Sequence, residues 1–566
     1  MKKLYLITGL SVIIILFFSG CNNTNSRSTN SPHLATEANQ ENIIVNTDPS
    51  VGGSMVFPIY QDPRQLNPFL LTTGETALVS KLIYEGLADI GPNGQFYPRL
   101  AKELPTKENG GVTDDGLTIT WKLREGVFWS DGEPFTSDDV KFTWEFVTFP
   151  GSPAYAKSQG WRLIDSIETP DDYTVVVHYR SFYYNYLDQF IGYESGILPR
   201  HSCGNPSDIT NWDCNRNPIG TGPFILSEWK PNESLTLIRN PNYRDTSKPY
   251  LDRIVFPIIP DENIRKSMLI SGEGDAMLWV NFEQTNELEA SGVQVTPGTD
   301  MWLLRLGFNL AGGPEGNSPH PILEDLRIRQ AIQLAVDPRL ITQGVLDDRG
   351  QVISHELYHG LTPCPSPQIE YSKDQAAALL EEAGWIDTNS DGIRECVTCD
   401  TVAKGTPMEL TLVTSSDPPT YARMGIIISD ELREVGINVT VEVPEDMWER
   451  FGNGDFDLGF WDDGYTSDPL GMLGTYYRSD SIGEGNIFRY KSDTIDEMLE
   501  HVSTITDSDE RLQYFCQIDQ LLLDDLPSIW IASMPYPDAF SARMAGWTAN
   551  PSDYMTWDAE NWYIKP

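Results

Sequence analysis

The chain has 566 residues, and its 40 lysines and arginines against 82 aspartates and glutamates give a formal net charge of −42. A surface this acidic repels phosphate, which excludes nucleic acid as a partner, and the length predicts at least two domains. With 40% hydrophobic and 11% aromatic residues, the chain has the composition of a folded protein. Its single long apolar stretch lies at the extreme N-terminus, which excludes an integral transporter.

The N-terminus has the order of a secretory signal peptide, which we assign to residues 1–20. Met1-Lys2-Lys3 is cationic, residues 4–18 are almost wholly apolar, and Ser-Gly precedes Cys21. The apolar run is shorter than the ~20 residues that span a membrane. Cys21 after this small pair resembles the bacterial lipobox, which implies lipidation of Cys21 by diacylglycerol. The alternative is an ordinary signal peptide followed by a chance cysteine.

Residues 21–50 begin at the lipidated cysteine and are rich in Asn, Ser and Thr. Such a segment buries too little apolar surface to order itself, so we expect a flexible tether. Anchor, tether and folded domains together predict a protein held on the outer face of the cytoplasmic membrane, in a periplasmic or extracellular location.

Six cysteines follow Cys21, an even number that suggests disulfides in an exported protein. Cys203 and Cys214 bracket a short polar loop and are predicted to pair. Cys396 and Cys399 form a single CxxC motif, for which a structural disulfide is favoured because a zinc ribbon needs two such motifs and a thioredoxin-type site needs a small βαβ domain. The connectivity of the rest stays open.

Strand and helix patterns alternate along the rest of the chain. Residues 117–123 alternate apolar and polar side chains, as a half-exposed strand does. Helices are predicted at 137–146 with Ser137 as N-cap, at 325–336, and at 372–383 before Gly384. This mixture, without an eightfold repeat, predicts an α/β protein of two lobes rather than a barrel.

Several short segments occur in an order known from one protein family. They are LNP (66–68), IYEGL (83–87), WKLREGVFWSDG (121–132), FTSDDV (135–140), PIGTGPF (218–224), GEGD (272–275), DLRIRQAI (325–332) and LLEEAGW (379–385). The chain therefore resembles family 5 of the bacterial extracellular solute-binding proteins, the oligopeptide- and dipeptide-binding proteins of ABC importers. The resemblance covers nearly all of the chain after the tether.

The resemblance implies a type II periplasmic-binding-protein-like fold with an enlarged lobe 1 and a ligand cleft at a two-segment hinge. Lobe 1 is expected at 51–305, with an extra subdomain at about 90–200, and lobe 2 at 306–527. Residues 528–566 are expected to return to lobe 1. The chain should cross between the lobes near 308–310 and near 531–533.

Two glycine pairs in these segments have a local explanation. Gly126 and Gly132 stand at turns that flank an aromatic strand end. Gly220 and Gly222 are expected to take positive φ in a tight crossover before a strand resumes at Phe224. All four are expected to serve the scaffold rather than the ligand.

The candidate ligand site centres on residues 456–469. Peptide-binding members of the family have Gly-Trp-x-Ala-Asp-Tyr here, and the resemblance implies that their Asp holds the peptide α-ammonium; Gly464 stands at that position in this chain. Neighbouring carboxylates are candidates to replace it, Trp302 and Trp461 are candidate aromatic walls, and a solvated acidic loop is the alternative. The candidate ligand-binding residues are Trp461, Asp462, Asp463, Tyr465, Asp468, Trp302 and Asn309.

The resemblance implies a monomeric binding protein that closes on a peptide and delivers it to ABC permease and ATPase subunits, with no enzymatic activity and no required cofactor. An oligosaccharide, nickel or an opine-like solute is the alternative ligand. A receptor in place of the permease is an alternative partner.

Two further motifs suggest metal chemistry. Residues 355–359 match the HExxH signature of zinc proteases, with Glu356 as base, His355 and His359 as ligands and Glu381 as a third ligand. The neighbouring glycines and proline leave little room for the helix that this motif requires. Asp387, Asn389, Asp391 and Glu395 match the first half of an EF-hand loop, a possible weak Ca²⁺ site whose alternative is a simple Asx/Gly turn.

Overall fold

A computed structural model describes residues 49–565 except 71–72, 93, 155–159, 192–195, 205–208, 210–211, 297–298, 356–363, 366, 400, 416–418, 465–468, 484 and 551, and except the side chains of 299–301. The predicted signal peptide, Cys21 and most of the tether lie outside these residues. Within the described part, none of the helices combines the length and the apolar character that a membrane crossing requires.

Lobe 1 is built around the largest hydrophobic cluster, which contains the buried tryptophans Trp121, Trp129, Trp161 and Trp562. A four-stranded sheet has the order β1-β9-β8-β7, and a three-stranded sheet has the order β4-β6-β5. Helices α1 and α2 and the pair β2-β3 complete this part. The bounds are β1 Ser54–Val56, α1 Gly74–Ser80, β2 Ala88–Ile90, β3 Phe96–Pro98, β4 Thr118–Lys122, α2 Ser137–Thr148, β5 Ile164–Asp171, β6 Thr174–Tyr179, β7 Phe224–Lys230, β8 Ser234–Arg239 and β9 Arg253–Pro257.

The C-terminal segment joins lobe 1, since β21 lies between β10 and β11 in a small antiparallel sheet. Helices α3 and α4 accompany this sheet, and β22 pairs with β23 near the C-terminus. The bounds are α3 Glu262–Ser271, β10 Ala276–Met277, α4 Phe282–Ala290, β11 Gln294–Val295, β21 Ala539–Phe540, β22 Met544–Ala545 and β23 Tyr563–Ile564.

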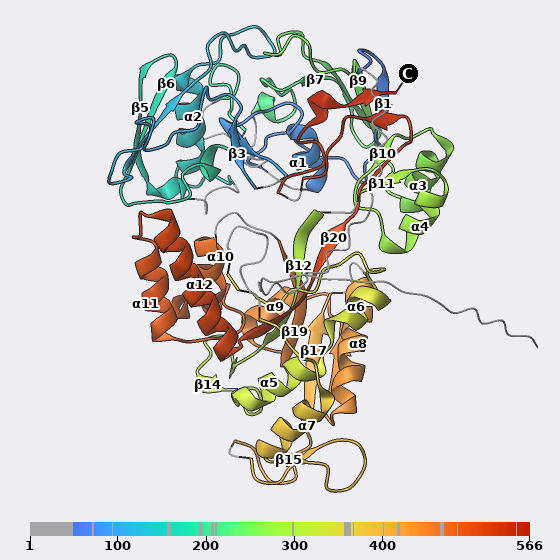
Figure 1. The fold of residues 1–566 in the computed structure, drawn as a ribbon. Helices are drawn as coiled ribbons and strands as arrows, with labels where there is room; N and C mark the ends of the chain where they lie inside the picture. Colours follow the sequence, from blue (N-terminus) through green and yellow to red (C-terminus); the bar gives the residue numbers. More distant parts are fainter. Residues whose placement is uncertain are drawn as a thin grey trace, which may run out of the picture. The chain divides into compact units, whose positions relative to one another are not determined.

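Lobe 2 contains a mixed five-stranded sheet of order β18-β17-β19-β12-β20 (Figure 1). Residues of α5, α6, α7 and α8 share one hydrophobic cluster with one face of this sheet, and residues of α9 to α12 share another with Trp461 and Val413 on the opposite face. The strands are β12 Thr299–Phe308, β17 Glu409–Thr414, β18 Asn438–Glu442, β19 Leu458–Gly464 and β20 Ser528–Tyr536. The helices are α5 Leu326–Ala335, α6 Pro338–Gly344, α7 Lys373–Glu382, α8 Thr420–Glu434, α9 Met447–Asn453, α10 Pro469–Tyr477, α11 Asp493–Val502 and α12 Ser508–Asp525.

Short elements complete the connections. They are the strand pairs β13 Ala311–Gly312 with β14 Ser318–Pro319 and β15 Trp385–Ile386 with β16 Glu395–Cys396, and the 3₁₀ helices η2 Trp161–Leu163, η3 Asp188–Phe190, η5 Asp213–Asn215, η6 Ser479–Ser481 and η7 Ala559–Asn561.

The crossings between the lobes differ from those expected near 308–310 and 531–533. Strands β12 and β20 pair with each other from Thr299 to Gly307 inside the sheet of lobe 2, and Phe308 and Ile531 are buried in its core. The chain instead leaves this sheet near Thr296 and Asp538. There the Thr296 amide donates to the Asp538 carbonyl at 2.8 Å, and the Asp538 amide donates to Thr296 Oγ1 at 2.8 Å. The lobe boundaries therefore lie about ten residues away from the expected ones, on the N-terminal side of β12 and the C-terminal side of β20.

The elements predicted from local patterns agree with the structure to within two residues, as α2, α5, α7 and β4 show. One cap differs: α2 is capped by Thr136 rather than Ser137, in a reciprocal capping box with Asp139. Gly126 and Gly132 have the positive φ expected of turn glycines, 70° and 95°.

The positive φ expected at Gly220 and Gly222 is wrong. The requirement for glycine comes instead from close packing, since a Cβ on Gly220 would lie 1.9 Å from the carbonyl oxygen of Ile83 and one on Gly222 would lie 2.6 Å from it.

Three disulfides link the six cysteines after the tether. Cys203 is bonded to Cys214 in lobe 1, and Cys396 is bonded to Cys399 beside α7. Cys364 and Cys516, which sequence reasoning left without an assigned partner, are bonded to each other across 152 residues of sequence.

Candidate ligand-binding cleft

A cavity of about 630 Å³ lies where the two lobes meet. Its walls come from the segment after β1, the start of α1, helices α3 and α4, the start of α8 and the end of β20. The described residues that line it are Pro58, Ile59, Tyr60, Gln61, Gly74, Glu75, Glu262, Arg265, Leu278, Trp279, Val280, Asn281, Phe282, Glu283, Pro419, Thr420, Arg423, Met534 and Tyr536. This size suits a small organic ligand, because pockets for such ligands have ~300–1,000 Å³.

The position of Trp279 in this wall follows from three local constraints. Its backbone has φ of 52°, and its amide donates to Asp538 Oδ1 at 3.1 Å next to the interlobe crossing. Gly74 lies against the indole, since a Cβ there would be 2.7 Å from Trp279 Cη2. The indole is thereby held with 40% of its surface exposed, although large apolar side chains are ordinarily buried.

Tyr536 is the centre of a cluster of aromatic rings at the cavity wall. Tyr536 contacts Trp279, Phe282 and Trp302 with ring centroids 6.2–6.3 Å apart. Trp302, predicted as a wall, therefore lies behind Tyr536 rather than among the lining residues. Flat apolar faces of this kind suit the side chains of a peptide and the faces of sugar rings alike.

The cavity also carries charges of both signs. Glu283 on α4 pairs with Arg423 on α8, an ion pair that joins the two lobes. The Arg265 guanidinium donates to the carbonyls of Ile259 and Pro260 at 2.7 and 2.9 Å. Glu75 and Glu262 add two further carboxylates.

The predicted site residues on β19 alternate between the two faces of the sheet. Trp461 and Asp463 point to the side of α9 to α12, where Trp461 packs on Phe451 and Phe488 and donates from Nε1 to Asp463 Oδ1 at 3.0 Å. Trp461 is thus a core residue. Asp463 Oδ2 lies 2.8 Å from Nε of the fully buried Arg305, so this carboxylate already has a cationic partner.

Asp462 points to the opposite face, toward the cavity side, and accepts a hydrogen bond from the Tyr421 hydroxyl. Burial raises the pKa of Asp462 to about 6, with the neighbouring Asp463 charge adding to the rise. The Tyr421 hydroxyl also shares a side-chain hydrogen bond with Tyr536, which lines the cavity. Asp462 therefore lies behind the wall through Tyr421.

Asn309 is not brought to the cleft. Its side-chain amide donates to the carbonyls of Gly454 and Phe456 at 3.1 and 2.7 Å, which fastens the end of β12 to the segment before β19. Tyr465 and Asp468 lie outside the described residues. The sequence did not identify Glu75, Trp279 and Tyr536 as lining residues, because no motif or hydrophobic period marks them. The nearest local signal is Gly74, a glycine next to Glu75 at the start of a helix.

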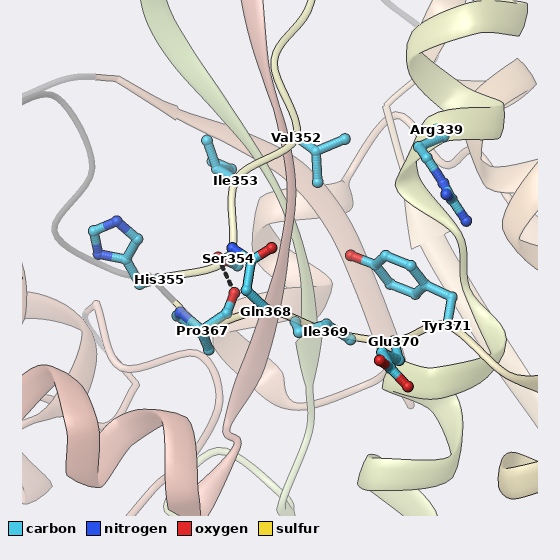
Figure 2. Close-up of a pocket in the computed structure, with 10 residues that line it drawn as sticks. All are labelled: Arg339, Val352, Ile353, Ser354, His355, Pro367, Gln368, Ile369, Glu370 and Tyr371. Carbon is cyan, nitrogen blue, oxygen red and sulfur yellow. Dashed lines mark hydrogen bonds between the residues drawn. The ribbon is translucent and has the colours of Figure 1, made fainter. Parts of the chain in front are cut away.

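A second cavity of about 540 Å³ lies wholly within lobe 2 (Figure 2). Three of its polar side chains already have partners: Ser354 donates to the Pro367 carbonyl at 3.2 Å, Arg339 pairs with Asp337, and His355 Nδ1 lies 3.4 Å from Asp519. Because one lobe alone forms it, a ligand there would not couple to lobe closure. The interlobe cavity is the better candidate.

The metal motifs have other contacts in the structure. His355 pairs with Asp519 as above, Glu381 Oε1 lies 3.6 Å from Arg394, and Glu356 and His359 lie outside the described residues. In the EF-hand-like loop, carboxylate oxygens of Asp387, Asp391 and Glu395 lie within 4.8 Å of one another. Asn389 donates to Asp391 and Glu395 at 3.0 and 2.6 Å, so its amide nitrogen faces both carboxylates.

Comparison with known proteins agrees with this architecture. The oligopeptide-binding protein AppA of Bacillus subtilis is 26% identical over 98% of this chain and 98% of its own. The structure of AppA with a nonapeptide has a TM-score of 0.68 and 24% identity, covering 92% of this chain and 100% of that one. The structure of NikZ from Campylobacter jejuni with Ni(L-His) has a TM-score of 0.72 and 24% identity, covering 90% and 99%. At these identities the two structures show the shared two-lobed fold alone. The model of the bacterial extracellular solute-binding proteins, family 5 Middle, matches residues 95–484, more than half of the chain, and the chain belongs to this family.

Proposed function

We propose that this protein captures a peptide in the interlobe cavity outside the membrane and delivers it to the permease and ATPase of an ABC importer. The observation that carries the proposal is the composition of the cavity wall, to which both lobes contribute aromatic and charged side chains. A ligand that touches both walls stabilises the closed arrangement by the difference in its affinity for the closed and open states. The oligopeptide-binding relative supports a peptide as the ligand.

The proposal also covers the membrane anchor of the protein and the absence of catalysis. Diacylglycerol on Cys21 anchors a monomer through residues 22–50, because two acyl chains hold a protein stably where one does not. The ligand is released unchanged, without catalysis. Lobe 1 comprises about 51–296 and 538–566, and lobe 2 the residues between, on the basis of the hydrophobic clusters and the paired crossings.

The test starts from the full mature chain purified without denaturant. Native mass spectrometry should show a bound species of peptide mass, and calorimetry of the emptied protein with synthetic tri- to nonapeptides should give saturable binding at micromolar concentration or tighter, about −8 kcal/mol. Small-angle scattering should show contraction on binding. Chemical conversion of the peptide, or binding without contraction, would contradict the proposal.

A different solute is the second candidate, and one observation favours it. Gly464 stands where peptide-binding relatives carry the ammonium-binding Asp, and Asp463 beside it is already paired with Arg305. NikZ, whose structure is similar to this one, holds Ni(L-His), a ligand that is not a peptide. A copurified sugar, opine or metal complex in the mass spectrum would decide for this candidate.

The loop at 387–395 is proposed as a weak Ca²⁺ site formed by Asp387, Asn389, Asp391 and Glu395, in which the Asn389 amide would turn its oxygen instead of its nitrogen toward the ion. Hard oxygen ligands and the 4.8 Å grouping of three carboxylates support it. Millimolar CaCl₂ should raise the melting temperature of the wild type by a few degrees and leave that of Asp391→Asn unchanged, since Ca²⁺ binds the folded loop. An equal effect of MgCl₂ and CaCl₂ on both proteins would contradict it.

A further inference from the structure

Glu75 differs from the other carboxylates that line the cavity. It lies in the first turn of α1, only 5% of its surface is exposed, and it forms no hydrogen bond or ion pair with any residue that the structure describes. Glu283 is paired with Arg423, and Glu262 is half-exposed to solvent. Among the described lining residues, Glu75 is therefore the carboxylate that combines deep burial with the lack of a hydrogen-bonded or ion-paired partner.

Neither of the two arginines that line the cavity forms an ion pair with Glu75 among the described residues. The guanidinium of Arg265 attracts Glu75 electrostatically, but no hydrogen bond joins the two described side chains, and Arg265 Nη1 donates instead to the carbonyls of Ile259 and Pro260. Arg423 is engaged by Glu283. A buried carboxylate without a partner costs free energy, which a cation arriving from outside recovers.

We propose, building on the peptide capture argued above, that Glu75 receives the cationic group of the ligand, which in a linear peptide is the α-ammonium. An ammonium group supplies three donors and one positive charge, and a charge-assisted bond to a buried carboxylate is about twice as strong as a neutral one. Trp279 lies against Gly74 beside it and provides an aromatic wall for the adjoining part of the ligand. Specificity for a free amine thus comes from lobe 1, whereas Asp463 is taken by Arg305 in lobe 2.

The experiment compares free-amine and N-acetylated forms of the same synthetic tri- and tetrapeptide mixtures, measured by calorimetry on the full mature chain. Wild-type protein should bind the free-amine form at least about tenfold more tightly, a difference of ~1.4 kcal/mol. Glu75→Gln keeps the size of the side chain and removes the charge, so the two forms should then bind within about twofold of each other. Glu262→Gln, in the same wall but half-exposed, is the matched control and should keep the wild-type preference.

The remaining outcomes are also decisive. Equal binding of both peptide forms by the wild type, or a preference that survives in Glu75→Gln, overturns the inference. If no peptide binds, the proposal of peptide capture is wrong, and the copurifying species then tests the role of Glu75 separately. A cationic species that is lost in Glu75→Gln supports the inference. A neutral or anionic species, or none, overturns it. Unchanged thermal unfolding of Glu75→Gln excludes misfolding as the cause of a loss.

Discussion

Arg305 and Asp463 form a buried ion pair on diagonal positions of the neighbouring strands β12 and β19. The guanidinium is fully buried, and its central carbon lies 3.9 Å from the ring centroid of Trp530 and 4.8 Å from that of Tyr476. Its Nη1 donates to the Tyr477 hydroxyl at 2.9 Å. The cation is thus enclosed by rings and has Asp463 as its counter-charge.

Replacing Asp463 should therefore affect folding more than binding. Asp463→Asn leaves a buried cation without its counter-charge, which costs about 3–5 kcal/mol in the free energy of unfolding. Urea denaturation measures this loss. Asp455→Asn, which removes an exposed carboxylate paired with Arg450, is the control and should cost less than about 1 kcal/mol. Full stability of Asp463→Asn together with loss of peptide binding would mean that Asp463 is a ligand-binding carboxylate after all.

The two glycine pairs allow steric contact and backbone conformation to be separated. A Cβ on Gly220 would overlap the Ile83 carbonyl oxygen, whereas a Cβ on Gly126 would meet nothing within 4 Å and only its φ of 70° opposes substitution. Gly220→Ala is expected to lose several kcal/mol of stability or to fail to fold, and Gly126→Ala to lose about 1 kcal/mol. Thermal and urea unfolding of both variants decide this; similar losses would contradict it.

Much of the fold is accessible from the sequence because its signals are local. The cap residues and apolar spacing that place α5 and α7 lie within each helix itself, and the observed bounds agree with the predicted ones. The crossings between the lobes were misplaced because β12 and β20 are continuous strands. Where such a strand leaves a sheet depends on its partner strands, which lie far away in the sequence.

The site was harder to predict from the sequence, because it too depends on contacts between segments that lie far apart in the chain. The sequence marks Asp462 and Asp463 as acidic, but the register of β19 on β12 decides that one faces the cavity side and the other faces Arg305. Glu75 belongs to a short helix of ordinary composition. Only the approach of α3, α4 and α8 from other parts of the chain makes it a buried lining residue.

Asp538 should give folding a pH dependence at the interlobe crossing. Burial raises its pKa to about 7, against an ordinary value of 3.8. The folded state therefore holds a proton that the unfolded state has lost between about pH 4 and pH 7, so the contribution of Asp538 to stability falls as pH rises through this window. At about 1.4 kcal/mol per pKa unit, the loss is a few kcal/mol.

Asp538→Asn removes this titration and keeps an oxygen to accept from the Trp279 amide. Relative to the wild type, the variant should gain stability steadily from pH 4 to pH 7 and then level off, as urea unfolding across this range would show. Asp165→Asn removes an exposed carboxylate and should leave the shape of the curve unchanged. If the difference in the free energy of unfolding between the wild type and Asp538→Asn is constant with pH, the prediction is wrong.

A second contact between the lobes lies away from the lining residues of the cavity. Tyr184 of lobe 1 accepts from the Leu470 amide at 3.3 Å, and its ring packs on Phe515 with centroids 6.0 Å apart. The Arg511 guanidinium lies 4.6 Å from the centroid of the same ring. These partners belong to α10 and α12 of lobe 2, so the contact depends on the approach of the lobes.

Tyr184→Ala should therefore weaken the binding of every ligand by the same factor. The hydrogen bond, ring contact and cation–π contact of Tyr184 together contribute about 2 kcal/mol. The substitution removes part of this energy from the closed state alone and so lowers the population of the binding-competent form. Because apparent affinity scales with that population, we expect affinity to fall about tenfold. Calorimetry with free-amine and N-acetylated peptides should give parallel losses, and scattering should show a more extended unliganded protein. Phe128→Ala, which removes an exposed ring of lobe 1 elsewhere, should change neither quantity. A change in the ratio of the two affinities would place Tyr184 in contact with ligand, and unchanged affinity with unchanged scattering would show that the contact does not bias closure.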